Sequence, residues 1–209
     1  MKDNWILEEY ELSVLSSLFG GDGLFGTKIE KTDDIPGTLK DQWIEKGYIA
    51  EVDGALRIES SLELVMVTML DPDAAISLST ENDPGEICCL YLHGETIVLL
   101  LSENEKYHLF WLPFIPAALG AVYQFYLDVT TKGKDDENLM RYDMRSVFSR
   151  GASGRICRSG KGLTALEDGA DERVPEPDDE GCFRRFQKFI VYSHSECMRR
   201  VLEKAEASA

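Results

Sequence analysis

Apolar positions recur at helical spacing through the first residues of the chain. Within 4–19 one helix face would carry Leu7, Tyr10, Val14 and Leu18. The glycines at 20–23 would end this predicted amphipathic helix. A second, short helix is expected over 38–47, because Pro36 precedes it and Gly47 follows its last turn.

A β-hairpin is predicted directly after the second helix. Apolar and polar residues alternate over 48–52 and 55–58, and Asp53-Gly54 between them is a strong hairpin-turn signal. A helix followed by a hairpin is typical of a winged-helix unit. Ser60 can then cap a third helix, which Asp71-Pro72 terminates.

The middle of the chain is expected to be rich in β-structure. Four apolar segments separated by short turns predict an antiparallel meander of strands over 75–79, 87–92, 96–101 and 107–112. Residues 98–101 are apolar at every position, which predicts an interior strand covered on both faces. A helix over about 116–127 would cover one of these faces.

Residues 107–127 contain no Asp, Glu, Lys or Arg, so their length alone fits a membrane span. Pro113 and Pro116 interrupt any single helix there, and the neighbouring Glu105 and Asp128 are acidic instead of basic. We therefore expect no membrane insertion. Since no targeting segment is visible at the N-terminus, the expected location is the cytoplasm.

The second half predicts another hairpin, a loop and a long helix. Residues 147–148 and 155–157 flank a glycine-rich turn at 151–154, and 167–180 form an acidic loop that contains prolines. The final helix, about 180–205, has one apolar stripe made by Phe186, Phe189, Ile190, Ser193, Cys197 and Val201.

Together these elements predict an α+β fold, with a central antiparallel β-sheet flanked by helices. We expect a single domain over 1–209, composed of a helical, winged-helix-like part (1–72), a sheet part (73–165) and a C-terminal helix (180–206).

Charge excludes nucleic acid as a general partner. The 209 residues carry 22 basic and 38 acidic side chains, a formal charge of −16. Residues 1–100 hold 6 basic and 20 acidic residues, a formal charge of −14. Such a surface repels phosphates. The basic residues of 141–161 form a solvated face, a partner to the acidic half of the chain, or a docking patch for an acidic protein.

No catalytic or metal-binding constellation is predicted. The five cysteines are odd in number and contain no C-x-x-C pair, which fits neither a disulfide framework nor a zinc site and suits a reducing cytoplasm. His93, His108 and His194 lack metal-ligand spacing. Cys197 and His194 lie one helical turn apart and could form a nucleophile pair, but no third group that would orient them is indicated. We expect no cofactor and no enzymatic activity.

The order of elements resembles the EspG-type chaperones of type VII (ESX) secretion. The resemblance rests on the segment Trp43 to Ile49, the Asp53-Gly54 turn, the helix Leu62 to Leu70, the segment Pro72 to Leu78, and the later Gly154-Arg155 and terminal helix. It implies a cytosolic, non-enzymatic chaperone with a central antiparallel sheet between helical bundles. This chain is shorter than the family, and its acidic first half has no counterpart there.

The resemblance also implies a cargo and a cargo site. The cargo would be a secreted helical hairpin, of the PE/PPE type or of the WXG or LXG type. The cargo-binding residues carried over are Glu81, Asn82, Asp83, Pro84 and Gly85 in a loop, with Phe186, Phe189 and Ile190 on the terminal helix. The alternative function is a winged-helix transcriptional regulator that reads DNA with 36–58. Its recognition helix, 39–46, would carry Lys40 and Lys46 but also Asp41 and Glu45, a net charge of zero.

Overall fold

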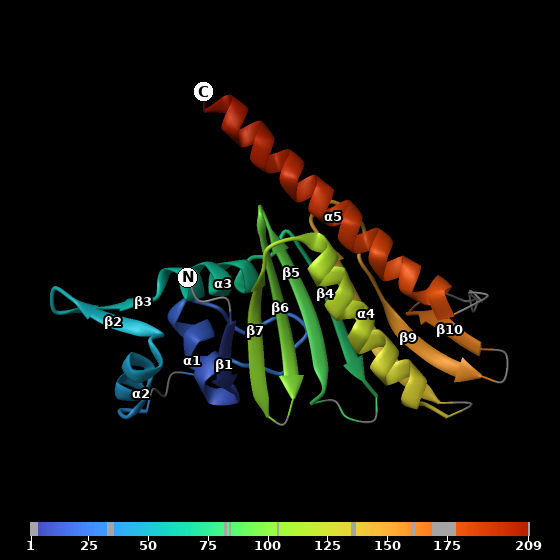
Figure 1. Cartoon of the computed structure of the whole chain (residues 1–209), viewed down its shortest axis with the longest axis horizontal. Coiled ribbons are helices and arrows are strands. Elements are labelled where there is room, and N and C mark those ends of the chain that lie inside the picture. Colours follow the sequence, from blue (N-terminus) through green and yellow to red (C-terminus); the bar gives the residue numbers. More distant parts are fainter. Residues whose placement is uncertain are drawn as a thin grey trace.

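The computed structural model contains one large antiparallel sheet with helices on both faces (Figure 1). It describes residues 4–32, 36–81, 83, 85–103, 105–134, 137–159, 162–168 and 179–208. The strands are β1 Asn4–Glu8, β2 Ile49–Val52, β3 Ala55–Ile58, β4 Ala74–Thr80, β5 Ile87–His93, β6 Thr96–Glu103, β7 Lys106–Leu112, β8 Asn138–Ser146, β9 Ala152–Ser159 and β10 Gly162–Glu167. The helices are α1 Glu9–Leu18, α2 Leu39–Lys46, α3 Ser60–Leu70, α4 Ile115–Lys132 and α5 Asp179–Ala207.

The predicted meander is confirmed, and it extends on both sides. The large sheet has eight strands in the order β1-β7-β6-β5-β4-β8-β9-β10. The interior position predicted for residues 98–101 is also confirmed, because β6 lies between β7 and β5. Val98 and Leu100 belong to the core on one face of the sheet, and Leu99 belongs to the core on the other. The α+β prediction is therefore correct.

The prediction of one helix over 4–19 is wrong. Residues 4–8 form β1, and the helix starts only at Glu9. Trp5 and Leu7 are buried while Asn4 and Ile6 are exposed, which is the period-two pattern of a strand. Of the stripe expected for the helix, Tyr10 and Leu18 are exposed. Helical spacing was therefore continued by chance across the boundary between a strand and a helix.

The helix, hairpin and helix that follow are as predicted. Gly47 ends α2 in the left-handed conformation, and Asp53 and Gly54 both have positive φ at the β2–β3 turn. The cap of α3 differs from the prediction. The Glu59 carboxylate accepts the backbone N–H of Leu62 at 2.9 Å, so Glu59 and not Ser60 is the N-cap residue.

The sheet separates two hydrophobic cores. On one face, α1 and α3 cover β5, β6 and β7 with residues such as Leu12, Leu15 and Met66. On the other face, α4 and α5 cover the middle and the β10 side of the sheet. Figure 1 shows α4 and α5 on the same side of the sheet, and the C-terminal end of α5 extends beyond it.

The second predicted hairpin exists, but its turn lies earlier in the chain. β8 ends at Ser146 and β9 begins at Ala152, so Ser153 and Gly154 lie within a strand and not in a turn. Gly154 is needed where it is, because a Cβ there would lie 2.0 Å from the carbonyl oxygen of Leu166. Most of the predicted acidic loop, 169–178, lies outside the described residues.

The uncharged stretch 107–127 is divided between β7 and α4. Across the described part of the chain, no helix combines the length and the apolar character that crossing a membrane requires.

Candidate functional site

The predicted cargo loop connects β4 to β5 and contacts the neighbouring hairpin. The Glu81 N–H donates to the carbonyl of Leu139 at 3.3 Å, and the Glu81 carboxylate lies 3.4 Å from Arg155 Nε on β9. Asn82 and Pro84 lie outside the described residues, so the structure places only Glu81, Asp83 and Gly85 of the predicted loop.

Asp83 organises the described part of this loop. Its N–H donates to the Thr80 hydroxyl at 3.1 Å, and its Oδ1 accepts the Gly85 N–H at 3.0 Å. The N–H of Glu86 also donates to the Asp83 carbonyl, at 2.9 Å. Since Asp83 itself is exposed, the loop presents a carboxylate from a backbone held by its own hydrogen bonds.

The predicted residues on α5 do not share one accessibility. Phe186 and Ile190 are completely buried, whereas Phe189 is half-buried. Phe186 packs edge-on against Tyr142 of β8 and Tyr126 of α4, with ring centroids 5.4 and 6.2 Å apart. The apolar stripe of α5 is therefore used to cover the sheet, and Phe186 and Ile190 cannot reach a cargo in this structure.

The loop and the helix stripe also point to opposite sides of the sheet. Arg155 pairs with Arg141, next in sequence to Tyr142, and adjacent residues of a strand face opposite sides. Glu81 contacts Arg155 on one face, while Phe186 contacts Tyr142 on the other. The structure therefore does not bring the two predicted halves of the cargo site together.

Part of the basic segment is paired with acidic neighbours. Arg145 pairs with Asp143 at 3.1 Å and Arg155 pairs with Glu81 at 3.4 Å. Arg141 lines a cavity of about 340 Å³ together with Asp143 and Asp168. This face therefore alternates charges and is not a uniformly basic patch.

The surroundings of Cys197 do not favour a reactive thiolate. Burial raises the pKa of Cys197 to about 12, so its reactive thiolate is scarce near neutral pH. Burial also lowers the pKa of His194. The described residues contain no cluster of His, Cys, Asp and Glu suited to a metal ion.

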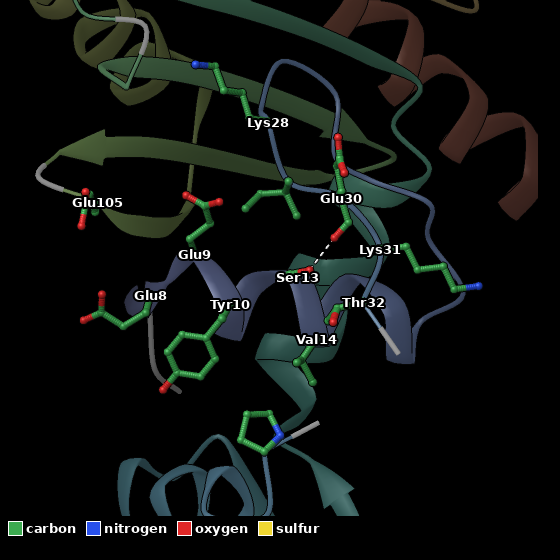
Figure 2. Close-up of a pocket in the computed structure, with 12 residues that line it drawn as sticks. Glu8, Glu9, Tyr10, Ser13, Val14, Lys28, Glu30, Lys31, Thr32 and Glu105 are labelled. Carbon is green, nitrogen blue, oxygen red and sulfur yellow. Dashed lines mark hydrogen bonds between the residues drawn. The ribbon is translucent and has the colours of Figure 1, made fainter. Parts of the chain in front are cut away.

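One cavity lies where β1 meets α1, in a region for which the sequence predicted no site. It has a volume of about 800 Å³, and charged residues of both signs line it. Figure 2 shows Glu8, Glu9 and Glu105 on one side and Lys28, Glu30 and Lys31 on the other. The Ser13 hydroxyl donates to the Glu30 carbonyl and fixes the segment that forms the second wall. Mixed charges in an open cavity give a polar contact surface without a catalytic arrangement.

Predicting a strand over residues 4–8 would have indicated where this cavity lies. The strand places Glu8 and Glu9 at the end of the sheet, beside the β6–β7 turn that carries Glu105. The helical interpretation of 4–19 concealed this proximity.

The comparisons with known proteins give a structural likeness. No family model matches the sequence, and no curated protein matches it either. The fold is similar to a solved structure of the type VII secretion system chaperone EspG5 of Mycobacterium tuberculosis in complex with a PE25–PPE41 dimer. The TM-score is 0.52 at 10% sequence identity, over 81% of this chain and 88% of the other. The fold is therefore EspG-like.

Proposed function

We propose that the chain is a non-enzymatic cytoplasmic chaperone that binds a helical secreted substrate of a type VII secretion system. The observation that carries the proposal is the likeness to EspG5 across most of both chains. The solved neighbour is bound to a PE25–PPE41 dimer, which makes PE/PPE-type proteins the first substrates to test, and WXG or LXG helical hairpins the second.

The physical properties of the chain agree with this role. A formal charge of −16 keeps a protein and its complexes apart by mutual repulsion. Apolar side chains such as Ile6 and Phe114 are about half exposed, which offers contact area for an apolar partner.

The alternative function, a DNA-binding winged helix, is less well supported. Both lysines of α2 are engaged by carboxylates, Lys46 by Glu11 at 2.6 Å and Lys40 by Glu51 at 3.6 Å. Paired cations release fewer counterions from DNA, so they contribute little affinity. If the protein retards a DNA duplex in a gel-mobility assay at moderate salt, that result would favour the transcriptional regulator.

Co-expression with candidate substrates tests the chaperone function. We expect a tagged chain to retain a PE/PPE pair or a WXG or LXG protein from the same organism, as a complex stable to gel filtration. Wild-type protein that retains none of them would contradict the proposal.

The loop at Asp83 can be tested in the same assay. Asp83→Arg adds bulk and reverses the charge at an exposed position, so it should reduce substrate capture if the loop is part of the cargo site. Asp83→Asn keeps an oxygen that can accept the Gly85 N–H and should capture substrate like wild type. Equal capture by Asp83→Arg, with unchanged thermal stability, would remove the loop from the site.

A further inference from the structure

One part of the sheet has an apolar face that the helices cover only in part. We call it the open sheet face, and it is formed by Ile6 of β1, Leu101 of β6, and His108, Phe110 and Leu112 of β7. Leu101, Phe110 and Leu112 pack against the margin of the core beneath α4 and α5, whereas Ile6 is exposed. Ile6 and Leu101 each pair with His108 across the strands, so their side chains lie on one face. Ile6 is 48% exposed, and the other four residues are half-buried.

This face is on the same side of the sheet as α4 and α5. Leu99 of β6 pairs with Phe110 and belongs to the core beneath these helices. The start of α4 contacts β6 and β7, and in Figure 1 the rest of α4 and α5 lie over the strands nearer to β10. Phe114, which is 55% exposed at the start of α4, continues the apolar surface at one end.

The open sheet face is uncharged at one end and acidic at the other. Its apolar part comes mainly from the uncharged stretch 107–127, so side chains here bring no charge. At the other end lie Glu8, Glu103 and Glu105, with Lys106 as the local cation, 3.8 Å from Glu8. An occupant therefore meets an apolar surface that ends in an acidic rim.

The backbone of β1 argues against an added strand as the occupant. The Tyr48 hydroxyl donates to the Ile6 carbonyl at 2.8 Å and accepts the Ile6 N–H at 3.3 Å. The Glu11 carboxylate accepts the Glu8 N–H at 2.9 Å. These backbone groups point away from the sheet, so they are the ones that an added strand would need for pairing. Because they are already hydrogen-bonded, a partner cannot pair with the edge of β1 at these positions and must bind the face of the sheet.

The dimensions of the open sheet face fit one helix. Neighbouring strands are about 4.8 Å apart, so β1, β7 and β6 together span about 10 Å. This is close to the diameter of a helix with its side chains. A helix placed there would lie beside α4 and complete the helical layer on this side of the sheet.

We propose that the open sheet face binds one amphipathic helix of the secreted substrate, with Lys or Arg residues at the end that meets Glu8, Glu103 and Glu105. The inference rests on the proposed chaperone function for the identity of the partner. The type of partner, an apolar helical stripe with a basic end, follows from the surface itself.

A synthetic helix tests the surface independently of the substrate. The probe is a fluorescein-labelled 18-residue peptide with a Leu stripe and Lys at the remaining positions, and binding is followed by fluorescence anisotropy. Wild type should bind it, and the double variant Ile6→Arg/Phe114→Arg should bind it at least about tenfold more weakly, because two anchor side chains are lost. The matched control Val67→Arg/Leu202→Arg changes two exposed apolar residues elsewhere and should bind like wild type.

The acidic rim is tested by charge reversal. Glu103→Lys should weaken binding of the Lys peptide about two- to fivefold at low salt and have less effect at high salt. The same peptide with Glu in place of Lys should bind wild type more weakly. Equal binding of the two peptides would overturn the assignment of a basic partner.

Substrate capture separates failure of the inference from failure of the proposed function. If wild type retains a secreted substrate and the Ile6→Arg/Phe114→Arg variant, folded by circular dichroism, retains it equally, the open sheet face is not the docking site. The inference is likewise overturned if the Ile6→Arg/Phe114→Arg variant binds the peptide with the same affinity as wild type. It is also overturned if wild type does not bind the peptide. If wild type binds the peptide through this face but retains no substrate, only the proposed function fails.

Discussion

The Glu11 carboxylate lies 2.6 Å from Lys46 Nζ, although the Glu11 side chain is completely buried. Glu11 also accepts the Trp43 indole N–H at 3.0 Å and the Glu8 backbone N–H at 2.9 Å. One carboxylate of α1 thus holds two residues of α2 and the end of β1. A buried charge is tolerated only when it is paired and hydrogen-bonded in this way.

Glu11→Gln should lower the free energy of unfolding by about 1–3 kcal/mol, because the amide keeps an acceptor for Trp43 but loses the charge that pairs with Lys46. Glu11→Leu should cost more, about 3–5 kcal/mol, since it also removes the acceptor of the buried Trp43 indole N–H and of the Glu8 N–H. Urea unfolding followed by tryptophan fluorescence measures both values. A Glu11→Gln variant as stable as wild type would show that the ion pair contributes nothing.

The same pair predicts a pH dependence at alkaline pH. Partial burial disfavours the charged ammonium, but the hydrogen bond and the charge of Glu11 outweigh it, so the pKa of Lys46 is raised. A raised pKa in the folded state means that the contribution is complete below the unfolded value of about 10.4 and is lost as pH rises through the folded value.

Lys46→Met isolates this contribution from other groups that titrate at high pH. The difference in unfolding free energy between wild type and Lys46→Met should be constant up to about pH 10 and should shrink above it. A difference that grows with pH would mean that the sign of the shift is wrong.

The N-cap residue of α3, Glu59, predicts that stability depends on pH in the acidic range. Slight burial acts to raise the pKa of Glu59, but hydrogen bonds from Ser61 and from the Leu62 N–H outweigh it and hold the pKa below its usual range. The stabilisation is therefore present above the unfolded value of about 4.3 and is lost as pH falls through the folded value.

Glu59→Ala should cost about 1 kcal/mol at neutral pH, the usual contribution of an N-cap. The gap from wild type should close in acid, below about pH 4. Glu59→Gln keeps a neutral acceptor, so its stability relative to Glu59→Ala should change little with pH. A gap between wild type and Glu59→Ala that persists in acid would contradict the cap assignment.

Two glycines are expected to respond differently to substitution by alanine, because one lies in close contact with other atoms and the other does not. At Gly154 a Cβ would meet the Leu166 carbonyl at 2.0 Å and the Tyr142 hydroxyl at 2.7 Å, so Gly154→Ala should destabilise by about 1–3 kcal/mol. At Gly120, within α4, nothing lies within 4 Å, and Gly120→Ala should be neutral or stabilising by up to about 1 kcal/mol. The melting temperature of Gly154→Ala should therefore be lower than that of wild type. The melting temperature of Gly120→Ala should be equal to that of wild type or higher.

The elements that could be predicted from the sequence are those that depend on local signals. The Asp53-Gly54 turn and the glycine that ends α2 depend on backbone conformations that few other residues adopt, so they could be predicted. The interior position of β6 was predictable because Val98, Leu99 and Leu100 require burial on both faces. β1 was missed because Leu7, Tyr10 and Val14 continue a spacing of three to four residues across the strand–helix junction.

The candidate site was harder to predict, for a geometric reason. An apolar stripe such as that of Phe186 and Ile190 has the same pattern whether it covers a sheet or faces a partner, and only the position of the sheet distinguishes the two. The open sheet face was hidden similarly. Its residues come from β1, β6 and β7, and they share a surface only because β1 joins the sheet beside β7.

Thiol reactivity gives a test that also bears on the enzymatic alternative. Cys88, Cys89, Cys182 and Cys197 are buried, and Cys157 is half-buried, 2.8 Å from the Asn138 side-chain oxygen. Burial raises the pKa of Cys89 to about 11 and that of Cys197 to about 12. Because the thiolate is the reactive species, iodoacetamide near neutral pH should label native protein mainly at Cys157, and Cys157→Ser should remove most native labelling. Denatured protein should be labelled at all five cysteines. Rapid labelling of Cys197 that disappears in His194→Ala would instead reveal an activated nucleophile, and it would count against a chaperone without enzymatic activity.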